Sequence, residues 1–313
     1  MPVAPQAPLA TATGQAVGGR GDQAVRNGAI DSLRLAAAAV IVLFHAGVVV
    51  GPLMPAAMGF FTVLVAYFSL RSDDAPMGAG VRRRADRLLR PFVIWASLAA
   101  AMKVADAIHN GAPPLSELTE WVPPLGSFNQ LWFLPFAFVV GLLAPRSPAT
   151  ASPLPISLFS GLLVLAAAWL MILDQINPPN GIYTFLIYTP SALLGFGLGY
   201  VDNTPATARA VGILCVLTGF SLWAMGVPGH AQLWAGVPAM LLAFHMPWRG
   251  SHLTRLAADL SLGVYLVHAA LIAVLAHVLP GGAAFPAFGV LALAGSVALA
   301  AAIRAAGLGR LVF

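Results

Sequence analysis

Long apolar runs separated by short polar segments dominate the hydrophobic pattern from residue 30 onward. An α-helix needs about 20 residues to cross a hydrocarbon layer of roughly 30 Å, and several of these runs lie near the short end of that requirement. The pattern predicts an all-α integral membrane protein, a polytopic bundle of about ten transmembrane helices. The predicted spans are 30–50, 56–70, 91–107, 131–144, 156–173, 182–200, 210–225, 233–246, 258–279 and 287–303.

Composition agrees with this pattern. Of the 313 residues 59% are hydrophobic and only 9% are charged, which is too little charged surface for a soluble globule of this size. The single cysteine, Cys215, lies within an apolar run and excludes both an internal disulfide and a cysteine-based metal site. Residues 1–28 are rich in Ala, Gly, Pro and Gln without an apolar period, so we expect a disordered cytoplasmic tail there and one transmembrane domain over 29–313.

Basic residues alternate with the predicted spans. If the N-terminus is cytoplasmic, 15 of the 16 Lys and Arg residues lie in cytoplasmic segments or at the cytoplasmic entry of the first span, and Lys103 is the exception. This distribution satisfies the positive-inside rule and predicts that both termini are cytoplasmic. It also explains the basic balance of +5 without a nucleic-acid partner, because the arginines are scattered over helix ends.

The first span carries two ionisable residues. Arg34 and His45 are eleven residues apart, which in a helix is about three turns and roughly 16 Å, so both side chains share one face. An ionisable group inside a membrane is costly to retain, and imidazole is well suited to proton transfer near neutral pH. We therefore expect His45 to be functional; the alternative is a structural histidine hydrogen-bonded between helices.

Four blocks of sequence resemble motifs of the membrane acyltransferase-3 family, whose members O-acylate bacterial glycans. The blocks occur in the family's order along nearly the whole chain. One departure concerns the family's Ser-Gly pair near the end of the second helix, where this chain has Val65 and Ala66: Ala66 keeps a small residue for close packing, and Val65 lacks the hydroxyl. The blocks are DSLRLAAAAVIVLFHAG from Asp31, the R-x-x-R pair Arg84 and Arg87, LWFL at 131–134, and SLGVYLVH at 261–268.

The resemblance implies a chemistry and a site. It implies transfer of a short acyl group, acetyl or succinyl, from cytosolic acetyl-CoA or succinyl-CoA to a hydroxyl of a cell-surface or exported glycan or glycolipid, at the inner membrane of a bacterium. Arg34, Arg84 and Arg87 are then expected to engage the phosphates of acyl-CoA, since guanidinium groups suit phosphate recognition. His45 is expected at the reaction centre, as general base or as acyl carrier.

The late motif and the LWFL block supply expected substrate contacts, namely Trp132, Tyr265 and His268. Each has a structural alternative: Trp132 as an interfacial anchor, and Tyr265 and His268 as packing polar groups on one helix face. The loop arginines can likewise act as topology determinants and lipid-headgroup ligands. The glycines of GFGLG at 195–199 favour close helix packing over phosphate binding.

Two other classes of function remain open from the sequence. The same intramembrane polar groups would also suit a transporter or flippase of a glycan or small metabolite, and a catalytically inactive scaffold is a third reading. A metal site is not expected, because H-x-x-x-H and H-E-x-x-H patterns are absent and most acidic residues lie outside the spans.

Overall fold

The computed structural model describes residues 27–49, 51–70, 77–113, 129–144, 153–178, 180–201, 204–246, 248, 250–279, 282–284 and 287–309. Within these residues the regular secondary structure is helical, and Leu154 and Val201 form an isolated bridge. The predicted tail 1–28 lies almost wholly outside them. The helices are α1 (Gly28–His45), α2 (Leu53–Leu70), α3 (Met77–His109), η1 (Asn129–Trp132), α5 (Phe133–Leu143), α6 (Ile156–Ile176), α7 (Asn180–Tyr200), α8 (Pro205–Ala224), η2 (Gln232–Gly236), α9 (Val237–His245), α10 (His252–Val278), η3 (Gly282–Ala284) and α11 (Phe288–Ala305).

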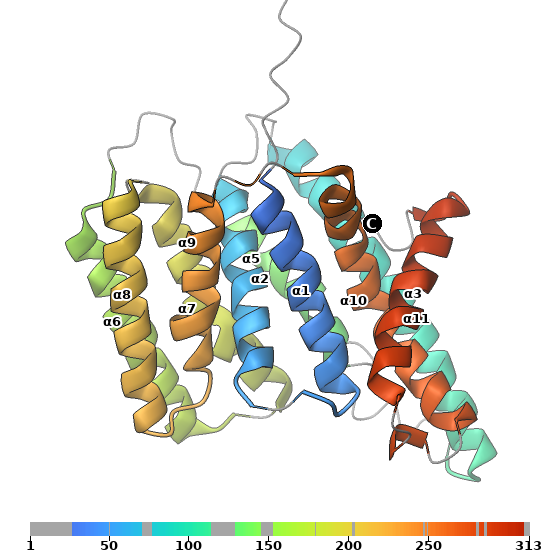
Figure 1. The fold of residues 1–313 in the computed structure, drawn as a ribbon. Coiled ribbons are helices and arrows are strands. Elements are labelled where there is room, and N and C mark those ends of the chain that lie inside the picture. Colours follow the sequence, from blue (N-terminus) through green and yellow to red (C-terminus); the bar gives the residue numbers. More distant parts are fainter. Residues whose placement is uncertain are drawn as a thin grey trace, which may run out of the picture.

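The all-α membrane architecture is confirmed in the described part of the chain. Eight of its helices are long and apolar enough to cross a membrane, and α5 is a shorter apolar helix. All ten predicted spans fall on observed helices, but 131–144 is divided between η1 and α5, and 233–246 is divided between η2 and α9. The helices stand side by side, with α6, α7 and α8 on one side of α1 and α2 and with α3, α10 and α11 on the other (Figure 1).

Among the helix boundaries that differ from the sequence prediction, two depend on a single proline or glycine. The stretch 71–90 is predicted as a charged loop, but α3 begins at Met77 and runs through Pro91. A proline disfavours helical geometry in the residue before it, which made Pro91 the predicted boundary, yet the Arg, Leu and Ala residues before it are strong helix formers. The first span is predicted to reach residue 50, but α1 ends at His45 because Gly47 adopts φ +73° and turns the chain.

The beginning of α1 is fixed to the end of α9. The Asn27 side chain accepts hydrogen bonds from the main-chain N–H groups of Ala29 (2.9 Å) and Ile30 (3.3 Å), and its amide donates to the carbonyl of Ala243 at 2.8 Å. This is an N-cap that also joins two helices. The end of α11 lies at the same end of the bundle, because Arg304 donates to Asp259, near the start of α10, at 3.2 Å (Figure 1).

Glycines allow α2 and α7 to pack closely at the centre of the bundle. A Cβ added at Gly195 would lie 2.6 Å from the carbonyl oxygen of Val63 and 2.7 Å from the Cβ of Ala66. A Cβ at Gly197 would lie 2.9 Å from Leu162 of α6. The prediction that 195–199 is a packing segment is confirmed, and so is the packing role of Ala66, which is completely buried.

Candidate active site

A cavity of about 450 Å³ opens beside the last turn of α1. This volume is typical of small-molecule sites. The lining comes from five elements whose ends meet here: the end of α1, the start of α2, η1, the start of α7 and the middle of α10. The lining residues are Ile41, Phe44, His45, Met54, Met58, Trp132, Thr184 and Tyr265.

His45 is the ionisable group of this lining. As the last residue of α1 it is half-buried, and the turn that follows exposes it to the cavity instead of enclosing it in the middle of a span. The ring of Phe44 lies 5.4 Å from the imidazole, centroid to centroid. A group bound in the cavity can therefore reach the imidazole at the end of the bundle opposite to the start of α1.

A second imidazole lies behind the first. The rings of His45 and His268 are 5.2 Å apart, and the ring of Tyr265 is 5.8 Å from that of His268. His268 is completely buried, and its Nδ1 lies 2.5 Å from the main-chain oxygen of Tyr265. Since a carbonyl only accepts, Nδ1 carries the proton and Nε2 is the acceptor; within the described residues that acceptor has no hydrogen-bond partner.

Aromatic packing fixes the opposite wall. Trp132 stacks on Tyr188 with ring centroids 5.0 Å apart, and the hydroxyl of Tyr188 donates to the sulfur of Met54 at 3.6 Å. The ring centroids of Phe133 and Tyr265 are 5.9 Å apart. Trp132 is buried in these contacts, so it presents an edge of a packed wall to the cavity. Such a wall holds a constant shape, because every ring is confined by its neighbours.

The three predicted arginines do not line this cavity. Arg34 lies eleven residues before His45 on α1, roughly 16 Å along the axis, with its Nη1 4.0 Å from the carboxylate of Asp31. Arg84 donates to the main-chain oxygens of Gly141 in α5 and Ser69 in α2, the latter at 3.3 Å. Arg87 is exposed one turn further along α3. Arg34 lies in the first half of α1, and Arg84 and Arg87 lie in the first third of α3; the two helices begin at the same end of the bundle (Figure 1).

The structure brings His45, Trp132, Tyr265 and His268 close together, leaves the three arginines apart from them, and adds residues that the motifs do not contain. Met54, Met58 and Thr184 were missed because methionine and a lone threonine are ordinary in apolar helices. Thr184 and Tyr188 are four residues apart and so share a helix face, which is the signal that could have found this wall. Among the described residues, no three His, Cys, Asp or Glu side chains are grouped closely enough to hold a metal ion.

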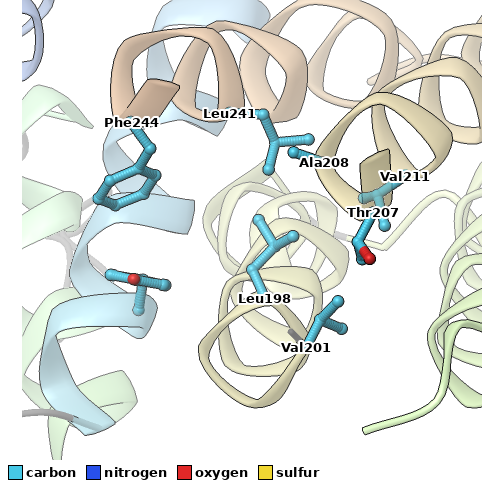
Figure 2. Close-up of a pocket in the computed structure, with 8 residues that line it drawn as sticks. Leu198, Val201, Thr207, Ala208, Val211, Leu241 and Phe244 are labelled. Atoms are coloured by element: carbon cyan, nitrogen blue, oxygen red, sulfur yellow. The ribbon is translucent and has the colours of Figure 1, made fainter. Parts of the chain in front are cut away.

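A second pocket lies between α2, α7, α8 and α9, and Figure 2 shows Leu198, Leu241 and Phe244 in its wall. Its free volume is about 10 Å³, roughly the space of one water molecule. It is a packing gap and not a site for a substrate.

Comparison with known proteins decides the class of protein. Residues 27–305 match the family described as an acyltransferase domain, the acyltransferase-3 family. The chain belongs to this family. It is therefore a multi-pass membrane enzyme that transfers acyl groups, and the resemblance of its four motifs is confirmed. No curated protein and no solved structure matches the chain.

Membership in the acyltransferase-3 family gives the His45 cavity a chemical context. Acyl transfer needs a group that takes a proton from the attacking nucleophile and a space that holds the acyl carbon beside it. An imidazole is a group of the first kind, and His45 lies in the wall of a cavity of about 450 Å³.

Proposed function

We propose that this acyltransferase moves a short acyl group from cytosolic acyl-CoA, either acetyl-CoA or succinyl-CoA, to a hydroxyl of a cell-surface or exported glycan or glycolipid. We place it in the inner membrane of a bacterium, with both termini cytoplasmic and membrane lipid around its apolar faces. The observation that carries the proposal is the position of His45 in the wall of a 450 Å³ cavity, some 16 Å along α1 from Arg34.

Two separate ends of the bundle serve the two parts of the donor. Arg34, Arg84 and Arg87 form the cationic end, where guanidinium groups engage the phosphates of CoA. The distance from Arg34 to His45 is comparable to the reach of the pantetheine arm, so the thioester arrives at the imidazole while the phosphates stay at the arginines. Trp132 and Tyr265 contact the acceptor in the cavity, and His268 supports His45 from behind.

His45 performs the proton transfer. Its imidazole takes the proton of the acceptor hydroxyl, the hydroxyl oxygen attacks the thioester carbonyl, the C–S bond breaks, and the CoA thiolate leaves and receives a proton. In the second route the imidazole attacks the carbonyl first, the C–S bond breaks and the CoA thiolate leaves; the hydroxyl oxygen then attacks the acyl-imidazole, the C–N bond breaks, and the hydroxyl proton passes to the released imidazole. Mass spectrometry of the protein after incubation with acyl-CoA alone distinguishes these routes, because only the second leaves an acyl mass on the chain.

The test is acyl transfer by membranes that contain the protein. With labelled acetyl-CoA, the wild type should release CoA and label the glycan fraction. His45→Ala should lower the rate by about 10²–10⁴-fold, the usual contribution of a general base. His277→Ala is the matched control, since His277 also lies in the last turn of its helix but is exposed outside the cavity. Undiminished transfer by His45→Ala, at equal expression, would remove His45 from the chemistry.

A further inference from the structure

The cavity beside His45 has no permanently charged lining. Apart from the imidazole, its seven lining side chains are aliphatic, thioether, aromatic or hydroxyl groups. Ile41, Met58, Trp132 and Tyr265 are buried, whereas Phe44 is exposed, so the inner part of the cavity is removed from water and its mouth is not. A carboxylate placed there would lose its hydration without gaining a cationic partner from these side chains.

The described connecting residues at this end of the bundle carry no permanently charged cation either. Lys and Arg are absent from 46–49, 51–52, 110–113, 177–178, 225–231, 279, 282–284 and 287, and the imidazole of His230 is the one basic group among them. Near the helix ends that lie here are Asp106, Asp174 and Lys103, together with the imidazoles of His109 and His277. Apart from Lys103, the described residues at this end therefore provide no permanently charged cation to balance an anion.

The acyl group of the donor has to lie in this cavity or at its edge. The acyl carbon must come within bonding distance of the acceptor oxygen that His45 activates, so the rest of the acyl group lies in the cavity or at its edge. The many negative charges of the donor belong to its CoA part and stay at the cationic end. A terminal carboxylate on the acyl group would be the one donor charge that is carried to the His45 end.

We propose that the enzyme selects an uncharged acyl group, and that acetyl-CoA is its donor in preference to succinyl-CoA. This inference rests on the proposed function, because it assumes that His45 is the reaction centre. The selection comes from the cost of removing a carboxylate from water without a partner, and not from size, since a cavity of 450 Å³ accepts a four-carbon acyl group.

A comparison of three donors separates the effect of the acyl group's charge from the effect of its size. Acetyl-CoA, butyryl-CoA and succinyl-CoA are compared by kcat/KM with the same membranes and acceptor, and butyryl matches succinyl in chain length without its carboxylate. We expect transfer from acetyl-CoA and butyryl-CoA, and a succinyl-CoA value at least about 100-fold below that of butyryl-CoA. Succinyl transfer within about threefold of butyryl transfer would overturn the inference. No transfer from any of the three donors would refute the proposed function itself.

A variant that places a cation in the cavity tests whether the missing positive charge causes the selection against succinyl-CoA. Met54 lines the cavity and is only half-buried, so Met54→Lys introduces a flexible ammonium group beside the acyl site. Met54→Lys should raise the ratio of succinyl to butyryl transfer by at least about tenfold, and the neutral control Met54→Gln should leave that ratio unchanged. A Met54→Lys enzyme that transfers acetyl but keeps the wild-type ratio would refute the electrostatic explanation. The wild-type comparison decides the inference even if Met54→Lys does not fold.

Discussion

The interface between α2 and α7 offers a sharp test of the packing that shapes the cavity. In the Gly195→Ala variant, the new Cβ would lie 2.6 Å from the Val63 carbonyl oxygen and 2.7 Å from the Ala66 Cβ. Ordinary contact begins at 3.4 Å, so the two atoms are 0.8 Å and 0.7 Å too close. Neither atom is the end of a flexible side chain, and the two helices must therefore move apart.

The magnitude follows from that overlap. Overpacking of a well-packed interior costs about 1–3 kcal/mol, and about 2–4 °C of Tm is lost per kcal/mol in a protein of 150–250 residues. We therefore expect Gly195→Ala to lower the Tm of the detergent-solubilised protein by about 2–12 °C. Acyl transfer should fall as well, because α2 carries Met54 and Met58 of the cavity and α7 carries Thr184.

Gly161→Ala is the matched control. Gly161 also lies within an apolar helix, α6, but a Cβ added there meets no atom within 4 Å. Its Tm should stay within about 2 °C of the wild type, because the added methyl group causes no overlap and alanine is the better helix former. Circular dichroism during heating, with size-exclusion chromatography of the heated samples, measures both variants. Equal Tm values for the two alanine variants would refute the assignment of Gly195 to a tight helix contact.

Three further predictions concern single side chains. Arg84→Ala should lower Tm by several degrees, because two hydrogen bonds to main-chain oxygens are lost, and it should also raise the KM for acyl-CoA. Arg87→Ala, at an exposed position, should raise that KM without changing Tm. Thermal unfolding measures the Tm of both variants, and steady-state kinetics measures their KM. His268→Leu should lower kcat at least about tenfold with an unchanged KM for acyl-CoA. His268→Gln retains a hydrogen-bond acceptor and should keep a higher kcat than His268→Leu. An equal loss of kcat in the two variants would contradict a role for the acceptor nitrogen. Burial lowers the pKa of His230, whose Nδ1 accepts a hydrogen bond from the indole N–H of Trp234 at 3.0 Å. The unfolded state therefore binds the proton more readily, and Tm should fall as pH drops below about 6.5. His230→Asn should weaken this pH dependence, which a series of Tm measurements at different pH values would show.

The sequence predicted the helices well because hydrophobic runs of membrane length are a strong and local signal. It failed at α3, where a proline and a charged stretch suggested a loop although the helix continues from Met77. It also placed His45 deep within a span, since the turn at Gly47 depends on a single positive φ angle that no apolar pattern reveals. Boundaries of this kind depend on local geometry and not on composition.

The candidate site was predictable only where a residue is chemically distinctive. His45 and His268 are unusual in apolar helices and belong to motifs, so both could be identified before the structure. Met54 and Met58 are unremarkable in sequence and become part of the site only because the starts and ends of several helices meet around one cavity. That convergence is a tertiary property and leaves no trace in the local pattern.

Arg84 shows how a motif residue can serve the fold as well as a ligand. The last four carbonyls of a helix have no partner within it, and α5 has only eleven residues, about 16 Å, so its end lies short of the roughly 30 Å that a spanning helix covers. Gly141 is in that last turn of α5 and Ser69 is in the last turn of α2, and Arg84 donates to the carbonyls of both. A cation at two helix C-termini is also favourable toward their dipoles.

It follows that Arg84 of the R-x-x-R pair stabilises the bundle even without CoA. The two arginines of the pair can therefore be separated by experiment. A variant of Arg84 perturbs the ends of α2 and α5 and, through the rigid length of α5, the wall that begins at Trp132. A variant of Arg87 does not touch these helix ends. Within the pair, a change in acyl-CoA affinity measured at Arg87 therefore reports on the proposed donor site, whereas the same change at Arg84 combines binding with packing.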